Sequence, residues 1–152
     1  LNKILLSLAG VVAAAILAGT LISFVFGSAH PGQGTRKSDP DPESISKDMA
    51  AFTELGQIRS LSKPESKNSK GITIIVTPWL SYTAGDKIFH EELVQKNRKI
   101  KSIITDYFST YTQKELLNIG EKNIKSELLH QINAELVLGK IAAVYFSEYM
   151  FL

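Results

Sequence analysis

The sequence predicts a single membrane-spanning helix followed by a small α+β domain. Three observations support this prediction: an uncharged apolar run over Ile4–Phe26, period-two alternation over Ile72–Tyr82, and apolar residues at helical spacing in two later stretches. A chain of 152 residues suits one modest domain. Its net charge of only +2 gives no reason to expect a nucleic-acid partner. These residues include no cysteine, so they contain no disulfide and no thiolate metal site.

The apolar run is the strongest local feature. Ile4–Phe26 holds no charged residue, and a helix over these 23 positions is about 34 Å long, enough to cross a hydrocarbon core of about 30 Å. The alternative is a cleaved signal peptide, because Gly27-Ser28-Ala29 resembles a cleavage site. Signal-peptide apolar regions are usually shorter, which favours an anchor over residues 1–26. A short N-terminal stub before one apolar segment favours an exported C-terminal part.

Small residues line one face of the predicted span. Gly10, Ala14 and Ala18 recur every four positions. Such a stripe lets two helix backbones approach closely in lipid, so it predicts a membrane helix interface. An alanine-rich span that faces lipid produces the same pattern, and both interpretations stay open.

A polar linker separates the anchor from the domain. Residues 27–50 are rich in Pro, Gly and Ser, which predicts an extended stalk. Within Ala51–Leu61, apolar residues recur every three positions, which fits a short helix better than a strand, although Gly56 weakens a helix there. We expect a strand in this segment only because of the family resemblance described below. Ile72–Tyr82 predicts a second strand, and Pro78 predicts an edge or a bulge within it, because proline cannot donate to a ladder. Trp79 falls on the more polar face, where we expect it to cover the sheet from outside.

Two long amphipathic helices follow. Lys87–Ser109 carries an apolar stripe, Asp86 is placed to cap its start, and Glu91, Glu92 and Lys96 fall on the opposite, solvent face. Thr112 and Glu115 have capping-box spacing before a short helix. The second long helix begins at Glu121, and we expect Gly139 to end it as a C-terminal cap.

The closing segment Ile141–Leu152 is almost continuously apolar. That pattern predicts a strand buried on both faces and therefore central in the sheet. Glu148 interrupts it, and we expect this residue to pair with a lysine or to lie exposed, not to act as a buried acid. The resulting order predicts an antiparallel-rich sheet covered by two long helices, which is an α+β fold.

No catalytic or metal-binding constellation is present. His30, His90 and His130 are far apart, and His90-Glu91-Glu92-Leu93-Val94 begins like a zinc-protease helix but has no second histidine at the required position. Catalysis needs several groups that converge on one site, and no motif predicts such convergence. We therefore expect no cofactor, no metal and no enzyme activity.

Several stretches together resemble the FliL family of flagellar basal-body proteins. The resemblance covers about residues 50–152 plus the anchor, and it consists of packing residues. The stretches that carry it are Phe52–Arg59, Lys101–Ser109, Thr112–Leu116, Asn133–Leu136, Gly139–Ile141 and Val144–Tyr149. The last of these shows the aromatic–small–Glu–aromatic pattern of the family's closing strand. This family signature corresponds to Tyr145, Phe146, Glu148 and Tyr149, as a structural and not a catalytic feature.

The resemblance implies a function without catalysis. FliL-like proteins are single-pass proteins of the bacterial inner membrane, with a periplasmic domain similar to the stomatin/prohibitin core, here residues 51–152. They form a homo-oligomeric ring around the flagellar stator, MotA/MotB, and support torque generation and motility. The partners implied are thus other copies of the chain, the stator and the membrane. Two alternatives remain at this stage: an exported ligand-binding module or enzyme, and a generic stomatin-like scaffold.

Overall fold

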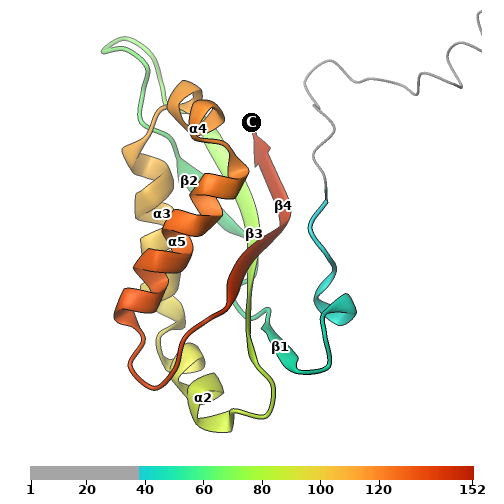
Figure 1. The fold of residues 1–152 in the computed structure, drawn as a ribbon. Coiled ribbons are helices and arrows are strands. Elements are labelled where there is room, and N and C mark those ends of the chain that lie inside the picture. Colours follow the sequence, from blue (N-terminus) through green and yellow to red (C-terminus); the bar gives the residue numbers. More distant parts are fainter. Residues whose placement is uncertain (1–37) are drawn as a thin grey trace, which may run out of the picture. The chain divides into compact units, whose positions relative to one another are not determined.

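A computed structural model describes residues 38–152, which form one antiparallel sheet and four α-helices packed on one of its faces (Figure 1). This arrangement confirms the predicted α+β class. The expected anchor and its small residues Gly10, Ala14 and Ala18 lie outside the described range. Within residues 38–152, no helix is long and apolar enough to cross a membrane. The elements are η1 (Pro42–Ser44), β1 (Met49–Phe52), β2 (Ile58–Leu61), β3 (Thr73–Thr83), α2 (Lys87–Gln95), α3 (Asn97–Thr110), α4 (Gln113–Ile119), α5 (Glu121–Glu135) and β4 (Ala143–Phe151).

Strand β3 is the centre of the sheet. It pairs antiparallel with β4 along one edge, and with β1 and β2 one after the other along its other edge. The single strand expected within Ala51–Leu61 is therefore two short strands. They are separated by a turn in which Gly56 adopts φ 60°, a backbone conformation that favours glycine.

The closing strand β4 lies at an edge of this sheet, so the prediction of a central position is wrong. Its register with β3 shifts between Thr77 and Pro78, which confirms the predicted irregularity at the proline. Thr77 is opposite Glu148 while Pro78 is opposite Phe146, so Ser147 is the extra residue of a β-bulge.

The bulge explains the continuous apolar pattern of β4. Side chains of a strand alternate between the two faces, and one extra residue reverses that alternation. Val144 and Phe146 before the bulge, and Tyr149 and Phe151 after it, all pack on the hydrophobic core. A strand with one buried face thus has the sequence of a strand that is buried on both.

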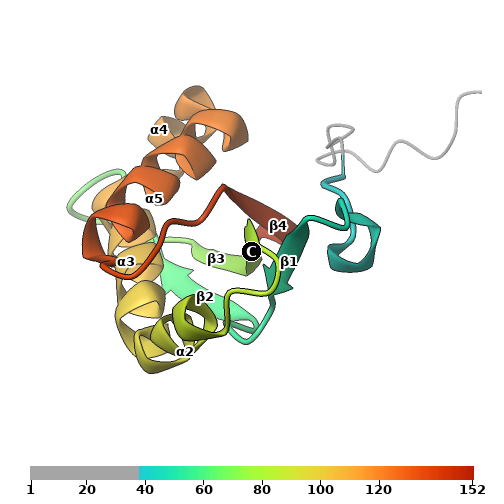
Figure 2. The same ribbon diagram turned by 60° about the horizontal axis from the view of Figure 1, so that its bottom comes forward.

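The core lies between the sheet and the helices, with α3 and α5 side by side over it (Figure 2). The predicted stripe of Lys87–Ser109 is buried, but it is divided between α2 and α3, which change direction at Lys96 (Figure 1). Both predicted N-terminal caps are present. The Asp86 carboxylate accepts a hydrogen bond from Phe89 N at 2.9 Å, and Thr112 forms a capping box with Glu115. Fully buried core residues of these helices and of β3 include Ile74, Val76, Leu80, Ile100, Ile104, Phe108, Ile124, Leu128 and Ile132.

Gly139 is not the cap of α5, which ends at Glu135 with Leu136 as its C-cap. Instead, the loop between α5 and β4 passes so close to α2 that a Cβ atom on Gly139 would lie 2.6 Å from Cδ2 of Phe89. Phe89 is itself buried, with only 2% of its surface exposed. Glycine is required at this position because of the close approach of loop and ring.

We therefore expect Gly139→Ala to lower the free energy of unfolding by about 1–3 kcal/mol, since overpacking forces a shift of the ring or the loop. Urea denaturation of the two proteins measures this difference. Exposed Ala142→Gly in the same connection is the control, with an expected change below about 1 kcal/mol. An unchanged midpoint for Gly139→Ala would contradict the close packing.

Candidate functional site

The family signature of β4 packs on both faces of the sheet. Phe146 and Tyr149 lie 5.6 Å apart between ring centroids on the helix-covered face, where Phe108 of α3 contacts both rings. Tyr145 lies on the opposite, helix-free face and stacks on Trp79 at 4.2 Å. As expected, Trp79 lies outside the helix-covered core, and it is itself almost fully buried. These aromatic residues hold β4 against its neighbours.

Glu148 of the signature belongs to a small polar network on the helix-free face. Its carboxylate accepts hydrogen bonds from Thr77 Oγ1 at 3.0 Å and from Gln57 Nε2 at 2.9 Å. Gln57 in turn accepts a bond from Arg59 Nε at 3.4 Å. Within residues 38–152 the carboxylate is thus bound by neutral donors, where the sequence predicted a lysine or an exposed position. The network connects β4 to the β1–β2 turn across the central strand.

His90 contacts a tyrosine and a glutamate. Its Nδ1 is 2.8 Å from the hydroxyl of Tyr82, and its Nε2 is 3.8 Å from the carboxylate of Glu54. Burial raises the pKa of Tyr82, and the charges of Asp86 and Glu54 raise it further. Within residues 38–152 no three His, Cys, Asp or Glu side chains lie close enough together to hold a metal ion. His30 lies outside this range.

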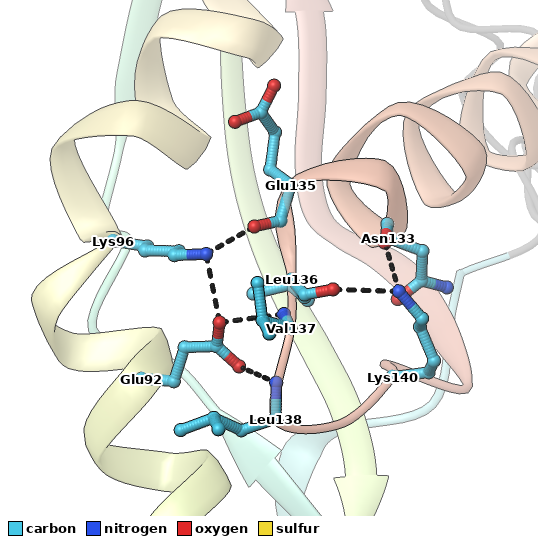
Figure 3. A network of polar contacts seen from close by, with 8 residues as sticks. All are labelled: Glu92, Lys96, Asn133, Glu135, Leu136, Val137, Leu138 and Lys140. Atoms are coloured by element: carbon cyan, nitrogen blue, oxygen red, sulfur yellow. Dashed lines mark hydrogen bonds and ion pairs between the residues drawn. The ribbon is translucent and has the colours of Figure 1, made fainter.

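A buried carboxylate fixes the loop between α5 and β4 (Figure 3). Glu92 of α2 accepts hydrogen bonds from the backbone N–H groups of Val137 and Leu138, each at 2.8 Å, and pairs with Lys96 Nζ at 2.9 Å. Burial alone would raise the pKa of the Glu92 carboxyl, but these three partners outweigh it and lower the pKa below its ordinary value of 4.5. Glu92 is only 5% exposed, so its predicted place on the solvent face is wrong.

Lysines complete the support of this loop. Lys96 Nζ also donates to the carbonyl oxygen of Glu135, and Lys140 Nζ donates to those of Asn133 and Leu136 (Figure 3). These carbonyls are in the last turn and cap of α5, where a helix leaves acceptors without intrahelical partners. The loop is therefore held from α2 on one side and from the end of α5 on the other.

A second charged junction connects the linker to the domain. The carboxylate of Asp39 lies 2.5 Å from Lys125 Nζ of α5 and accepts a hydrogen bond from Phe146 N at 2.7 Å. Lys125 also pairs with Glu121 at 2.6 Å and lies over the ring of Phe146. Lys125 and Asp39 are each only 16% exposed, so the charges are largely screened from water by the protein. The chain is thus attached to the domain ten residues before β1 begins.

Sequence reasoning missed both junctions. Glu92 had a recognisable signal, because it falls between Phe89 and Leu93 of the apolar stripe and four residues before Lys96. Asp39 and Lys125 had none, since 86 positions of sequence separate them. Neither junction brings together the groups of a catalytic site. Both fix segments of chain to the body of the domain.

Comparisons with known proteins agree with this description. A search of curated proteins gave no match. The family model of the flagellar basal body-associated protein FliL matches residues 63–151, which is more than half of the chain and runs from the loop before β3 to the end of β4. The matched region includes β3, all four helices and the bulged strand with its aromatic signature. This family is one of flagellar accessory proteins and is not known as a family of enzymes. The chain belongs to the FliL family and is a flagellar basal body-associated protein.

Proposed function

We propose that this protein is a single-pass protein of the bacterial inner membrane whose periplasmic domain assembles into a ring around the MotA/MotB stator. In that position it supports torque generation and motility. The observation that carries this proposal is the combination of family membership with the uncharged segment Ile4–Phe26, which is long enough to cross the bilayer. Residues 1–26 act as the anchor and residues 51–152 as the ring-forming domain, and the segment between them connects the two.

The junction at Asp39 gives the linker a mechanical role in this proposal. Because Asp39 is bound to Lys125 and to Phe146 N, only about residues 27–38 separate the proposed anchor from the attached chain. At about 3.3 Å per residue, such a tether reaches at most about 40 Å. It holds the domain near the membrane surface, beside the periplasmic part of a membrane-embedded stator.

Anchoring also makes a weak interface sufficient. Confinement to a plane raises the effective concentration of the copies, so that side-to-side contacts that are negligible in solution become populated. A heterologous contact joins two different surfaces of neighbouring copies. It closes a ring when a whole number of identical rotations between neighbours adds up to one full turn. The stalk and the membrane helix, with Gly10, Ala14 and Ala18 on one face, are placed to contact the stator at the inner side of such a ring.

Crosslinking from the linker tests the proposal. The chain contains no cysteine, so single cysteines introduced between Gly27 and Met49 are the only thiols in each variant. We expect several of these variants to form crosslinks to stator chains in living cells. A cysteine at Gln131, an exposed position of α5, is the matched control and is expected to capture none.

Two outcomes would contradict the proposal. The first is that no linker cysteine captures a stator chain in cells whose motors are intact. The second is that a strain without the protein swims and swarms normally, which would favour a generic membrane scaffold. Recovery of the native chain in the soluble fraction would instead favour an exported binding module.

A further inference from the structure

Three exposed apolar side chains lie together on the helix-free face of the sheet, at the end where β3 begins and β4 finishes (Figure 1). Leu61 pairs with Thr73, and the N–H of Leu152 donates to the carbonyl oxygen of Thr73 at 2.8 Å, so the three residues form one row. Met150 lies in the next row on the same face, opposite Ile75. We call Leu61, Met150 and Leu152, which are 57%, 38% and 67% exposed, the sheet-end patch. Adjacent exposed apolar side chains of this kind mark interaction sites.

Positive charge borders the sheet-end patch. One cation lies opposite Ile75 on the same face of the sheet, and three belong to the loop that directly follows Leu61. The carboxylate of Glu65 in this loop is directed to the start of α4, where it accepts a hydrogen bond from Lys114 N, and that of Glu148, one row further along the sheet, is bound by neutral donors. Within residues 38–152 none of the four cations forms a salt bridge, so they are available to an anionic surface. The four exposed cations are Arg59, Lys63, Lys67 and Lys70.

The linker enters the domain in the direction expected when this end of the sheet faces the membrane. Asp39 is bound to the backbone N–H of Phe146, which lies opposite Pro78 in the middle of β3. From there the chain continues through η1 to β1, whose Met49 pairs with Thr83 at the far end of β3 (Figure 1). The chain therefore moves away from the sheet-end patch as it leads from Asp39 into the sheet.

The length of chain before Asp39 is sufficient for this end to reach the bilayer. Leu152 is six positions beyond Phe146, which corresponds to about 20 Å of strand. The proposed tether of about residues 27–38 spans at most about 40 Å. The sheet-end patch can therefore contact the membrane surface while Asp39 stays bound to Lys125 and Phe146.

We propose that the sheet-end patch docks on the anionic surface of the bilayer that holds the anchor. Binding to a lipid surface gains free energy from apolar area buried among the headgroups and from attraction between basic side chains and anionic lipids. The sheet-end patch supplies the apolar area, and the four cations beside it supply the charge. The contact orients the domain with β1 and α2 away from the membrane. This inference rests on the anchor of the proposed function and adds the surface by which the domain meets the membrane.

Quenching by lipid tests the contact in the full chain. The chain contains no cysteine, so Met150→Cys carries a single thiol for a fluorescent label. The labelled chain is placed in nanodiscs of equal parts phosphatidylglycerol and phosphatidylcholine that contain a lipid with a nitroxide quencher near its headgroup. Val137→Cys is the matched control, because Val137 is apolar, 81% exposed and in the loop between α5 and β4, away from the sheet-end patch. We expect strong quenching at Met150→Cys, and again at Leu61→Cys on the neighbouring strand, but not at the control.

Removal of charge provides the second measurement. Each basic residue near an anionic membrane surface strengthens binding by about fivefold, so loss of three lysines should reduce quenching at Met150→Cys to the level of the control. Nanodiscs of phosphatidylcholine alone should have the same effect, and melting curves confirm that the variants are folded. Equal quenching at Met150→Cys and Val137→Cys, or quenching that does not depend on lipid charge and on the lysines, would overturn the inference. The combined substitutions are Lys63→Gln, Lys67→Gln and Lys70→Gln, and those of the matched control are Lys87→Gln, Lys99→Gln and Lys101→Gln on α2 and α3, which should leave quenching unchanged.

The same samples separate this inference from the proposed function. A chain that is not retained in the nanodiscs would overturn both the anchor and the lipid contact. A chain that is retained without quenching at Met150→Cys would overturn the lipid contact and leave the anchor standing. In native membranes, a label at Met150→Cys that is shielded from a soluble quencher only when the stator is present would show that the sheet-end patch binds a protein, and would also overturn the inference.

Discussion

Deletion of Ser147 is expected to lower the free energy of unfolding by about 3–6 kcal/mol and to leave the domain largely unfolded at growth temperature. Without the extra residue, the alternation of β4 becomes regular, so Val144 and Phe146 cannot face the core together with Tyr149 and Phe151. One of these pairs has to turn to the helix-free face. Loss of burial of each large apolar side chain is worth about 1.5–3 kcal/mol. Chemical denaturation of the full chain in detergent measures the difference.

Replacement without deletion provides the matched control. Ser147→Ala keeps the bulge and is expected to change the free energy of unfolding by less than about 1 kcal/mol. If the deletion variant unfolds at the same denaturant concentration as the wild type, the account of the bulge is wrong.

Removal of the buried carboxylate is expected to have the next largest effect. Glu92→Ala leaves the N–H groups of Val137 and Leu138 and the charge of Lys96 without their shared partner. We expect a loss of about 2–4 kcal/mol in the free energy of unfolding, because partners left unsatisfied in a buried site keep their desolvation penalty. Faster hydrogen exchange at Val137 and Leu138 should accompany this loss.

The pH dependence of stability identifies the ionised carboxylate as the cause. The pKa of Glu92 is lower in the folded state than its ordinary value of 4.5, so its contribution is present above pH 4.5 and is lost as the pH falls through the folded pKa. Glu92→Gln cannot ionise and should therefore lose less stability than the wild type on acidification. Glu91→Gln, at the exposed neighbouring position, should keep the wild-type profile. Equal acid profiles for the wild type and Glu92→Gln would contradict this role.

Local patterns were sufficient for the elements whose contacts are local. The alternation of Ile72–Tyr82, the apolar stripes of the helices and the caps at Asp86 and Thr112 all depend on residues a few positions apart. They are found in the structure where the sequence predicted them. Their physical signals are strong because each residue type acts through its own neighbours.

The errors concern features that depend on distant partners. The bulge at Ser147 depends on the pairing of β4 with β3 near Pro78, which no pattern within β4 indicates. Without the bulge, the apolar run of β4 is typical of a strand at the centre of a sheet. Gly139 resembled a helix cap but is required by the ring of Phe89, fifty positions earlier. The junction of Asp39 with Lys125 joins linker and α5, and no periodicity relates these positions.

The same division holds for the candidate site. The aromatic signature could be recognised because it is a short local pattern that resembles the closing strand of the family. The structure gives the physical reason for this pattern, since the bulge turns Phe146 and Tyr149 to the same face of the sheet. The loop at Val137 and Leu138 had no such signal, because the carboxylate that binds its backbone comes from Glu92, which is distant in sequence. Family membership gives the flagellar basal body as the place of action.

Imaging of motors in intact cells tests the central claim most directly. Cryo-electron tomography should compare cells that have the protein, cells from which its gene is deleted, and deleted cells that express the full chain again. The proposed function predicts a ring of density around each stator, at the periplasmic face of the inner membrane, that is absent after deletion and restored by expression. Stators surrounded by the same density in all three strains would contradict it.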